Sequence, residues 1–353
     1  MASHLVPSVQ EMVAASGGDV VPPRYLRPEV TSDPVAGDTK AAIPVIDFQR
    51  LLDPDASHVE LARFHGACQD WGFFQLINQS VPDGVAQAMM EVTEDFFRLP
   101  AETKKQFAQE PGQLDGCGHL FVVSEQQKLD WSDVLYLNTQ PPERRNMKFW
   151  PDSPANLRVT LDKYTAAVKN VAECLLAIMA KNLAIQPEAI AEKCIDGIQT
   201  VRMNYYPPCA QADKVIGLSP HSDAGLLTLV LQVNEVQGLQ IMRDGKWVPV
   251  SPIQGALIVN LGDTFEIFTN GRYMSVEHRV VVDPQKERLS IAVFHNPSMD
   301  AMIGPLKEIA TCEKDQVYMT VDHASFRRLY FSAKLEGKNF LEGMKLKISS
   351  SSS

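Results

Sequence analysis

Five side chains in three short segments have the types and spacing that chemistry at a metal ion requires. His221 and Asp223 are two residues apart, and His278 supplies a second imidazole further along the chain. In an extended strand, alternate side chains point to the same face, so His221 and Asp223 project together. Two histidines and one carboxylate on one side of a metal leave positions open on the other, which is the ligand set of non-haem Fe(II) oxygenases.

Arg288 and Ser290 follow the second histidine and are also two residues apart. A guanidinium fork beside a hydroxyl, facing the same way, suits bidentate capture of a carboxylate. A His-x-Asp pair alone is a weak signal, because such short matches are common by accident. Two further features strengthen the signal: His278 precedes a valine-rich run, and Arg-x-Ser follows that run with both side chains on one face. Together they predict an iron site with an organic acid bound beside it.

Seven further segments give the sequence a family resemblance. They are I-P-V-I-D at 43–47, W-G-F-F at 71–74, L-D-W-S-D at 129–133, N-Y-Y-P-P-C at 204–209, G-L-Q-I at 238–241, N-L-G-D at 260–263 and E-H-R at 277–279. With these segments in this order, residues 8–347 resemble the plant soluble Fe(II)- and 2-oxoglutarate-dependent dioxygenases. This isopenicillin N synthase-like family includes anthocyanidin synthase, flavonol synthase and the poppy alkaloid O-demethylases.

The resemblance implies an active site and a reaction. The family's catalytic iron ligands fall on His221, Asp223 and His278, and its 2-oxoglutarate-binding residues fall on Tyr206, Arg288 and Ser290, with Asn204 close by. The implied cofactors are Fe(II), 2-oxoglutarate and O2, with ascorbate as reductant. The implied reaction hydroxylates, oxidatively demethylates or desaturates a small, largely apolar plant metabolite or hormone and releases succinate and CO2.

The substrate-binding residues depend on a segment where the sequence departs from the family. The family's common Gly-Tyr-Gly is Gly-Cys-Gly at 116–118 here. By analogy, the segment that follows lies over the mouth of the barrel, which brings Phe121 and Val123 towards the pocket. Phe294 follows Arg288 by six positions, an even number, and therefore faces the same interior. We expect these three residues to border the substrate, although Phe121 and Phe294 could equally be core aromatics.

Three other functions are compatible with the same residues. An oxidase like the ethylene-forming enzyme would keep the metal ligands and the Arg-x-Ser pair without using 2-oxoglutarate. A non-catalytic jelly-roll protein would use the pocket only to bind a ligand or hormone. A zinc hydrolase would use the same three ligands but would leave Arg288 and Ser290 without a role.

Composition and charge restrict the partners. The length of 353 residues allows one large or two small domains, and a hydrophobic content of 45% supplies a substantial core. A net charge of −10 without a basic cluster makes nucleic acid and acidic membrane surfaces poor partners. Six cysteines without C-x-x-C spacing indicate a reducing compartment. Because neither a secretory signal nor an apolar run of ~20 residues is present, we expect a cytoplasmic monomer acting on a small molecule.

Strand-like segments dominate the sequence after Gly197. Eight are predicted, at 200–206, 226–232, 239–243, 246–250, 256–261, 265–268, 278–282 and 289–294, with a two-residue turn at Asp244-Gly245. Short strands with hairpin turns predict a jelly-roll barrel whose mouth can hold a metal and a small ligand. The predicted class is α+β, with a double-stranded β-helix core, an N-terminal α/β region and flanking helices.

Four regions are predicted along the chain. Residues 1–150 form the N-terminal α/β region with an extended arm, and residues 151–196 form a long scaffold helix and connector. Residues 197–300 form the jelly-roll core, and residues 301–353 form C-terminal helices and a disordered serine tail. Ser153 is expected to cap the long helix, with Pro154 in its first position. Asp130 and Asp133 are interpreted as structural.

Overall fold

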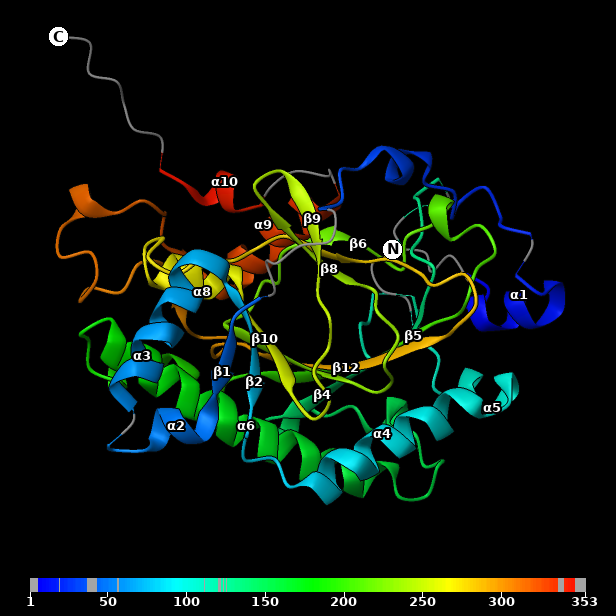
Figure 1. Ribbon diagram of the computed structural model, residues 1–353, viewed down its shortest axis with the longest axis horizontal. Coiled ribbons are helices and arrows are strands. Elements are labelled where there is room, and N and C mark those ends of the chain that lie inside the picture. Colours follow the sequence, from blue (N-terminus) through cyan, green and yellow to red (C-terminus); the bar gives the residue numbers. More distant parts are fainter. Residues whose placement is uncertain are drawn as a thin grey trace, which may run out of the picture.

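The computed structural model describes residues 6–18, 20–36, 43–55, 57–110, 112–119, 122, 124, 126–335 and 340–346 (Figure 1). Its large sheet has the order β1 (Val45–Asp47), β2 (Phe73–Ile77), β10 (Leu257–Leu261), β7 (Leu227–Gln232), β12 (Arg288–His295), β5 (Gln199–Tyr206), β4 (Asp133–Gln140) and β3 (Gly116–Gly118). All its neighbours pair antiparallel except β1 and β2, which are parallel.

A small sheet packs against one face of the large one. Its order is β6 (Leu218–His221), β11 (His278–Val280), β8 (Leu239–Arg243) and β9 (Lys246–Pro249), and β13 (Met302–Ile303) pairs with β14 (Val321–Asp322) elsewhere. A buried apolar cluster joins Phe73 and Ile258 of the large sheet to Ile241 and Val280 of the small one. Two sheets packed over a shared core confirm the predicted jelly roll.

Helices cover the outer face of the large sheet and the ends of the barrel. They are α1 (Val9–Ser16), α2 (Phe48–Leu52), α3 (Ser57–Gly66), α4 (Asp83–Arg98), α5 (Ala101–Lys105), α6 (Leu157–Asn182), α7 (Glu188–Ala191), α8 (Asp263–Phe268), α9 (His323–Leu335) and α10 (Phe340–Met344). Figure 1 shows α4 and α6 along the side of the large sheet that faces away from β6, β8 and β9. Within the described residues, no helix combines the length and the apolar character needed to span a bilayer.

Helix α6 is the scaffold helix that the sequence predicts. Its apolar residues Leu161, Tyr164, Val168 and Val171 recur every three or four positions and are completely buried. The helix begins later than predicted, with Asn156 before its first residue instead of Ser153. Residues 154–157 form a turn, closed by a hydrogen bond from the Leu157 amide to the Pro154 carbonyl, and the helix starts only after it.

One predicted strand is a helix in the structure, and one observed strand was not predicted. Residues 265–268 form part of α8 instead of a strand. Phe265, Ile267 and Phe268 are buried and only Glu266 is polar in this segment, and four residues are too few to distinguish a helical period from that of a strand. Strand β6 was not predicted, because it is short and contains Pro220. Its place at the edge of the small sheet explains how it tolerates a proline, which cannot donate a ladder hydrogen bond.

His295 joins the end of β12 to β5 and α6. The side-chain nitrogen of Gln199 donates to the Thr165 carbonyl and lies 3.1 Å from His295 Nε2. Because an amide NH2 only donates, His295 Nε2 must accept, which requires a neutral ring. Burial lowers the pKa of His295 to about 4.

This buried histidine predicts loss of stability in mild acid. In the unfolded chain this histidine has a pKa of about 6.5, so between pH 6.5 and 4 the unfolded chain binds more protons than the folded one. The contribution of neutral His295 to the free energy of unfolding is therefore complete above pH 6.5 and falls as the pH drops towards 4. From pH 7 to pH 5 the loss is about 2 kcal/mol from this group. Chemical unfolding at both pH values should show a smaller loss for His295→Gln, while the exposed His58→Gln should behave like the wild type. Equal losses in all three proteins would contradict the assignment.

Candidate active site

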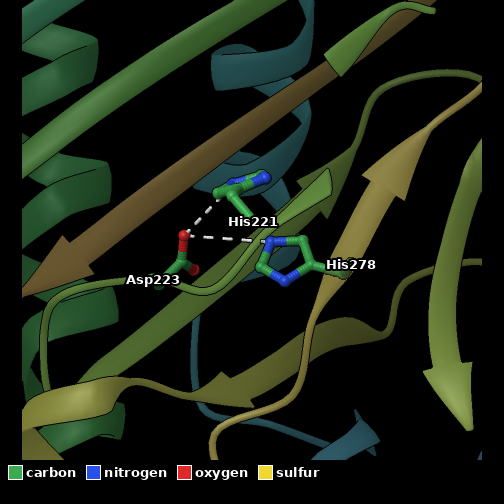
Figure 2. Close-up of side chains that lie close together, drawn as sticks. All are labelled: His221, Asp223 and His278. Atoms are coloured by element: carbon green, nitrogen blue, oxygen red, sulfur yellow. Dashed lines mark ion pairs between the residues drawn. The ribbon is translucent and has the colours of Figure 1, made fainter. Parts of the chain in front are cut away.

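The two predicted histidines and the aspartate converge where two strands of the small sheet meet. His221 ends β6, His278 begins β11, and the two residues are direct cross-strand partners. One oxygen of Asp223, Oδ1, lies 3.5 Å from His221 Nε2 and 3.8 Å from His278 Nε2 (Figure 2). One ligand atom from each of the three residues lies within 4.8 Å of the others, which is compact enough to hold a metal ion.

Backbone carbonyls set the orientation of both imidazoles. His221 Nδ1 lies 2.8 Å from the Ser219 carbonyl oxygen, and His278 Nδ1 lies 3.1 Å from the Val276 carbonyl oxygen. A carbonyl only accepts, so each Nδ1 donates its proton there and each Nε2 is left facing Asp223. This is the orientation that metal-binding histidines adopt.

Asp223 is held as an anion with one oxygen left for a metal. Its Oδ2 accepts hydrogen bonds from Thr228 Oγ1 at 2.6 Å and Asn260 Nδ2 at 2.8 Å. Burial favours the neutral acid, but His278, His221 and the Asn260 amide together hold the pKa of Asp223 well below its usual range. Two imidazole Nε2 atoms, a fixed carboxylate and an outer shell of hydrogen bonds fit a divalent metal such as Fe(II).

A second buried carboxyl links the two segments that carry the ligands. Ser222 Oγ donates to Asp263 Oδ2 at 3.0 Å, and Ser275 Oγ donates to Asp263 Oδ1 at 2.7 Å. Burial raises the pKa of Asp263 to about 7. Tyr330 of α9 adds a third tie, because its hydroxyl donates to the Ser222 carbonyl at 2.8 Å.

The predicted 2-oxoglutarate-binding residues lie on β5 and β12, two neighbouring strands of the large sheet. Arg288 pairs across the strands with Tyr206, and Ser290 pairs with Asn204. Ser290 Oγ lies 3.2 Å from Arg288 Nη1 and 3.3 Å from Asn204 Nδ2. All four residues are buried. The structure therefore brings together a guanidinium, a hydroxyl, a phenol and an amide at one place.

This group has polar atoms that an added carboxylate would satisfy. Arg288 is only 2% exposed, and within the described residues its Nε has no hydrogen-bond partner and no carboxylate forms an ion pair with it. A cation buried without a counter-ion is costly. Gly238 keeps the approach to Arg288 open, because a Cβ at that position would lie 2.8 Å from Arg288 Cδ. These features fit the carboxylate of an organic acid.

A cavity of about 410 Å³ opens beside the candidate metal ligands. His221 and Asp223 form part of its wall, and Phe294 of β12 lines it as well. Phe121 and Val123 lie outside the described residues. Neither His119 nor His295 borders the cavity: His119 Nε2 lies 3.2 Å from the Pro7 carbonyl oxygen, and His295 belongs to the contact with α6.

Several residues of the site were not assigned a role from the sequence. Thr228 and Asn260 hold the free oxygen of Asp223, and Arg202 and Arg327 line the cavity. Arg202 could have been found, because it alternates with Asn204 and Tyr206 on β5 and must face the same interior. The contact of Thr228 with Asp223 depends on the path of the chain between β6 and β7, which carries no sequence signal.

The interpretation of L-D-W-S-D as structural agrees with the contacts of its two carboxylates. Asp133 accepts hydrogen bonds from Ser8 Oγ and from the amides of Val9 and Gln10, and so holds the first turn of α1. Asp130 accepts from the amide and hydroxyl of Ser219, just before His221.

Comparison with known proteins decides the family. A model of the 2OG-Fe(II) oxygenase superfamily matches residues 197–297, and a model described as non-haem dioxygenase in morphine synthesis N-terminal matches residues 43–153. The 2-oxoglutarate-dependent dioxygenase 11 of Oryza sativa subsp. japonica is 46% identical over 345 residues, covering 97% of this chain and 96% of that protein. The chain belongs to the 2OG-Fe(II) oxygenase superfamily.

Other relatives of this 2OG-Fe(II) oxygenase support the same conclusion. S-norcoclaurine synthase 1 of Coptis japonica is 48% identical over 327 residues, covering 92% of each chain. The crystal structure of JOX2 in complex with 2OG, Fe and JA superposes with a TM-score of 0.88 at 32% identity, covering 98% of this chain and 99% of that one. The predicted family, fold and enzyme class, a 2-oxoglutarate-dependent dioxygenase, are therefore confirmed. The three alternative functions are disfavoured.

Removing one hydrogen bond to Asp223 should weaken metal binding. Thr228→Val keeps the shape of the side chain but leaves Asp223 Oδ2 with Asn260 alone, and loss of such an outer-shell partner typically lowers metal affinity about 10–100-fold. Iron retained after dialysis against a chelator series measures the change. Thr93→Val is the matched control, because the hydroxyl of this buried threonine donates only to the Met89 carbonyl on α4. Equal iron retention in both variants would show that Thr228 has no such role.

Proposed function

We propose that this oxygenase binds Fe(II) through His221, Asp223 and His278 and uses it to oxidise a C–H bond of a small molecule held in the adjacent cavity. One observation carries the proposal: two imidazole Nε2 atoms and one carboxylate oxygen are turned towards a common point at the wall of that cavity. The other atoms of the three side chains are held by hydrogen bonds, so the set needs no rearrangement to accept a metal.

The second part of the proposal assigns 2-oxoglutarate to the polar group on β5 and β12. Arg288 would neutralise the carboxylate distant from the metal, and Ser290 would donate a hydrogen bond to it. Tyr206 and Asn204 pack against this pair, and the Asn204 Oδ1 atom is buried without a partner among the described residues. Fixing both ends of the cosubstrate positions it for reaction, which is the main contribution a protein makes when a cofactor carries the chemistry.

Bound Fe(II) supplies the redox chemistry that couples decarboxylation of 2-oxoglutarate by O2, giving succinate and CO2, to insertion of the second oxygen atom into a C–H bond. The protein orients the substrate bond near His221 and Asp223, and the walls of the cavity exclude water from it. Hydroxylation of a methoxy carbon would give a hemiacetal that breaks down to a free hydroxyl and formaldehyde, and desaturation is a further outcome. Thebaine 6-O-demethylase of Papaver somniferum is 40% identical, which supports demethylation as one candidate.

The proposal includes the conditions under which the enzyme works. Ascorbate as reductant is taken from the family resemblance. The six free cysteines support a reducing compartment, and we propose a cytoplasmic monomer.

Loss of the anionic ligand should abolish iron binding and turnover together. Asp223→Ala removes the only carboxylate among the three proposed ligands, so we expect iron content and 2-oxoglutarate-dependent succinate formation to fall to background. Metal analysis and succinate release with excess Fe(II) measure both. Asp244→Ala in the exposed hairpin turn is the control and should keep the wild-type values. An active, iron-replete Asp223→Ala protein would refute the metal assignment.

Replacing the guanidinium by an ammonium should weaken 2-oxoglutarate binding. Arg288→Lys keeps the charge but loses the fork, and losing charge-assisted hydrogen bonds should raise the KM for 2-oxoglutarate by roughly ten- to hundred-fold. Arg243→Lys is the control, because Arg243 stacks on Trp71 away from the site. If the KM for 2-oxoglutarate stayed constant while the affinity for the substrate changed, Arg288 would belong to the substrate site instead.

A further inference from the structure

The cavity beside the metal ligands is rich in positive charge, although the chain as a whole is acidic. Arg202 of β5, Arg327 of α9 and Arg144 of the short helix η3 (Pro142–Arg144) all line it. Asp223, already assigned to the metal, supplies the one carboxylate among the described lining residues. The net charge of the chain is −10, so three arginines at one cavity are a local feature and do not follow from the composition.

Among the described residues, Arg202 is a buried cation without a counter-ion. The residue is 7% exposed, and its Nε has no hydrogen-bond partner in the described part of the chain. Among the same residues, no carboxylate forms an ion pair with its guanidinium. Its cross-strand neighbours are Tyr136 and Ala292, and the Tyr136 hydroxyl donates to Thr200 instead. Burying an unpaired charge is costly, so its retention here needs a ligand to explain it.

Arg327 brings a second guanidinium to the same place from a different element. It lies one turn after His323 on α9, and both residues line the cavity. Burial raises the pKa of Tyr136, and Arg327 and Arg202 both act in the opposite direction, which places both cations near this one hydroxyl. The hydrogen bond from Tyr330 to the Ser222 carbonyl fixes α9 against the metal-binding segment.

Arg202 is distinct from the arginine assigned to 2-oxoglutarate. On β5, Arg202 lies four residues before Tyr206, and Tyr206 is the partner of Arg288. Ala292 lies opposite Arg202, and its small side chain leaves room beside the guanidinium. Arg202 borders the cavity together with Phe294, whereas Arg288 does not border it.

We propose that the substrate is an organic acid whose carboxylate binds Arg202 and Arg327. This inference rests on the proposed function and names the substrate class for that site. The apolar part of the acid packs against Phe294 and Phe326, which line the same cavity, and extends towards His221 and Asp223. A volume of about 410 Å³ falls within the range of about 300–1,000 Å³ typical of small-ligand pockets. The family resemblance implied a largely apolar substrate, whereas the proposed substrate is an amphipathic anion.

Binding of matched acids and esters tests the charge requirement directly. The probes are 4-phenylbutyrate, 1-naphthaleneacetate and trans-cinnamate, each with its methyl ester, which has nearly the same shape but no charge. Calorimetric titration uses the Fe(II)-loaded enzyme without O2, both with and without 2-oxoglutarate. We expect at least one acid to bind tenfold or more tightly than its ester, because charge-assisted hydrogen bonds to two guanidiniums are lost in the ester.

Arg202→Met removes the charge and keeps a side chain of similar length. The preference for acid over ester should fall about ten- to hundred-fold, while the Kd for 2-oxoglutarate should stay within twofold of the wild type. The melting temperature without ligand should be unchanged or higher, since an unpaired buried cation has been replaced by an apolar group. A structural arginine would give the opposite result, a lower melting temperature. Arg98→Met, on the exposed surface of α4, removes the same charge elsewhere and should keep the preference.

Three results would overturn the proposal. The first is a panel in which no acid binds more tightly than its ester. The second is an acid preference that survives in both Arg202→Met and Arg327→Met. The third is a loss of 2-oxoglutarate affinity in Arg202→Met, which would place Arg202 in the cosubstrate site. Failure of the wild type to bind 2-oxoglutarate would refute the proposed function separately, because the acid and ester comparison is also made without it.

Discussion

The buried negative charge of Asp223 must be stabilised by its surroundings, and this need determines how the centre of the protein is arranged. Asp223 is 6% exposed, and an isolated carboxylate at that depth would take up a proton. Two imidazoles on paired strands and two hydrogen-bond donors from the large sheet keep it ionised. The donors Thr228 and Asn260 lie on β7 and β10, so the anion connects the small sheet to the large one. The metal-binding geometry is therefore a consequence of how the two sheets are packed.

The large sheet fixes the distances between the functional groups. Its strands β5 and β12 pair over eight residues, which places Tyr206 with Arg288 at one end and Thr200 with Phe294 at the other. Residues that alternate along both strands face the barrel interior. Because a β-ladder is rigid, the proposed cosubstrate site at one end and the proposed substrate site at the other keep a constant relation to His221, Asp223 and His278.

The walls of the substrate cavity come partly from elements outside the barrel. Arg144 lies on a short helix after β4, and His323, Phe326 and Arg327 lie on α9 near the C-terminus. Helix α9 is also tied to the segment that carries His221 and Asp223, through the hydrogen bond from Tyr330 to the Ser222 carbonyl. Strand residues such as Thr200 and Phe294 complete the wall of the cavity. The cavity therefore combines residues of the barrel with residues that lie outside it.

The sequence by itself indicated the types of the candidate ligands, the positions of most strands and the family. Arg-x-Ser could be interpreted because the two-residue period of a strand is local, and the same period would have placed Arg202 on the same face as Asn204. Asp223 lies just beyond the end of β6, so its position beside His221 depends on the loop that follows the strand. The apolar stripe of α6 was equally local. The helix at 263–268 and strand β6 could not be predicted, because a six-residue segment is too short to show a clear period and an edge strand with a proline has a weak signal.

Only the tertiary structure decided which partners surround each functional group. Thr228 and Asn260 reach Asp223 from strands that are distant in the sequence from one another, and Arg202 and Arg327 meet at one cavity although 125 residues separate them. Whether a buried charge has a counter-ion depends on every chain segment packed around it. The sequence could therefore name Asp223, but only the fold showed that Asp223 has charged and hydrogen-bonding partners and that Arg202 has no carboxylate partner among the described residues. The reason is physical: electrostatic compensation acts through space, and the spacing of residues along a chain does not record it.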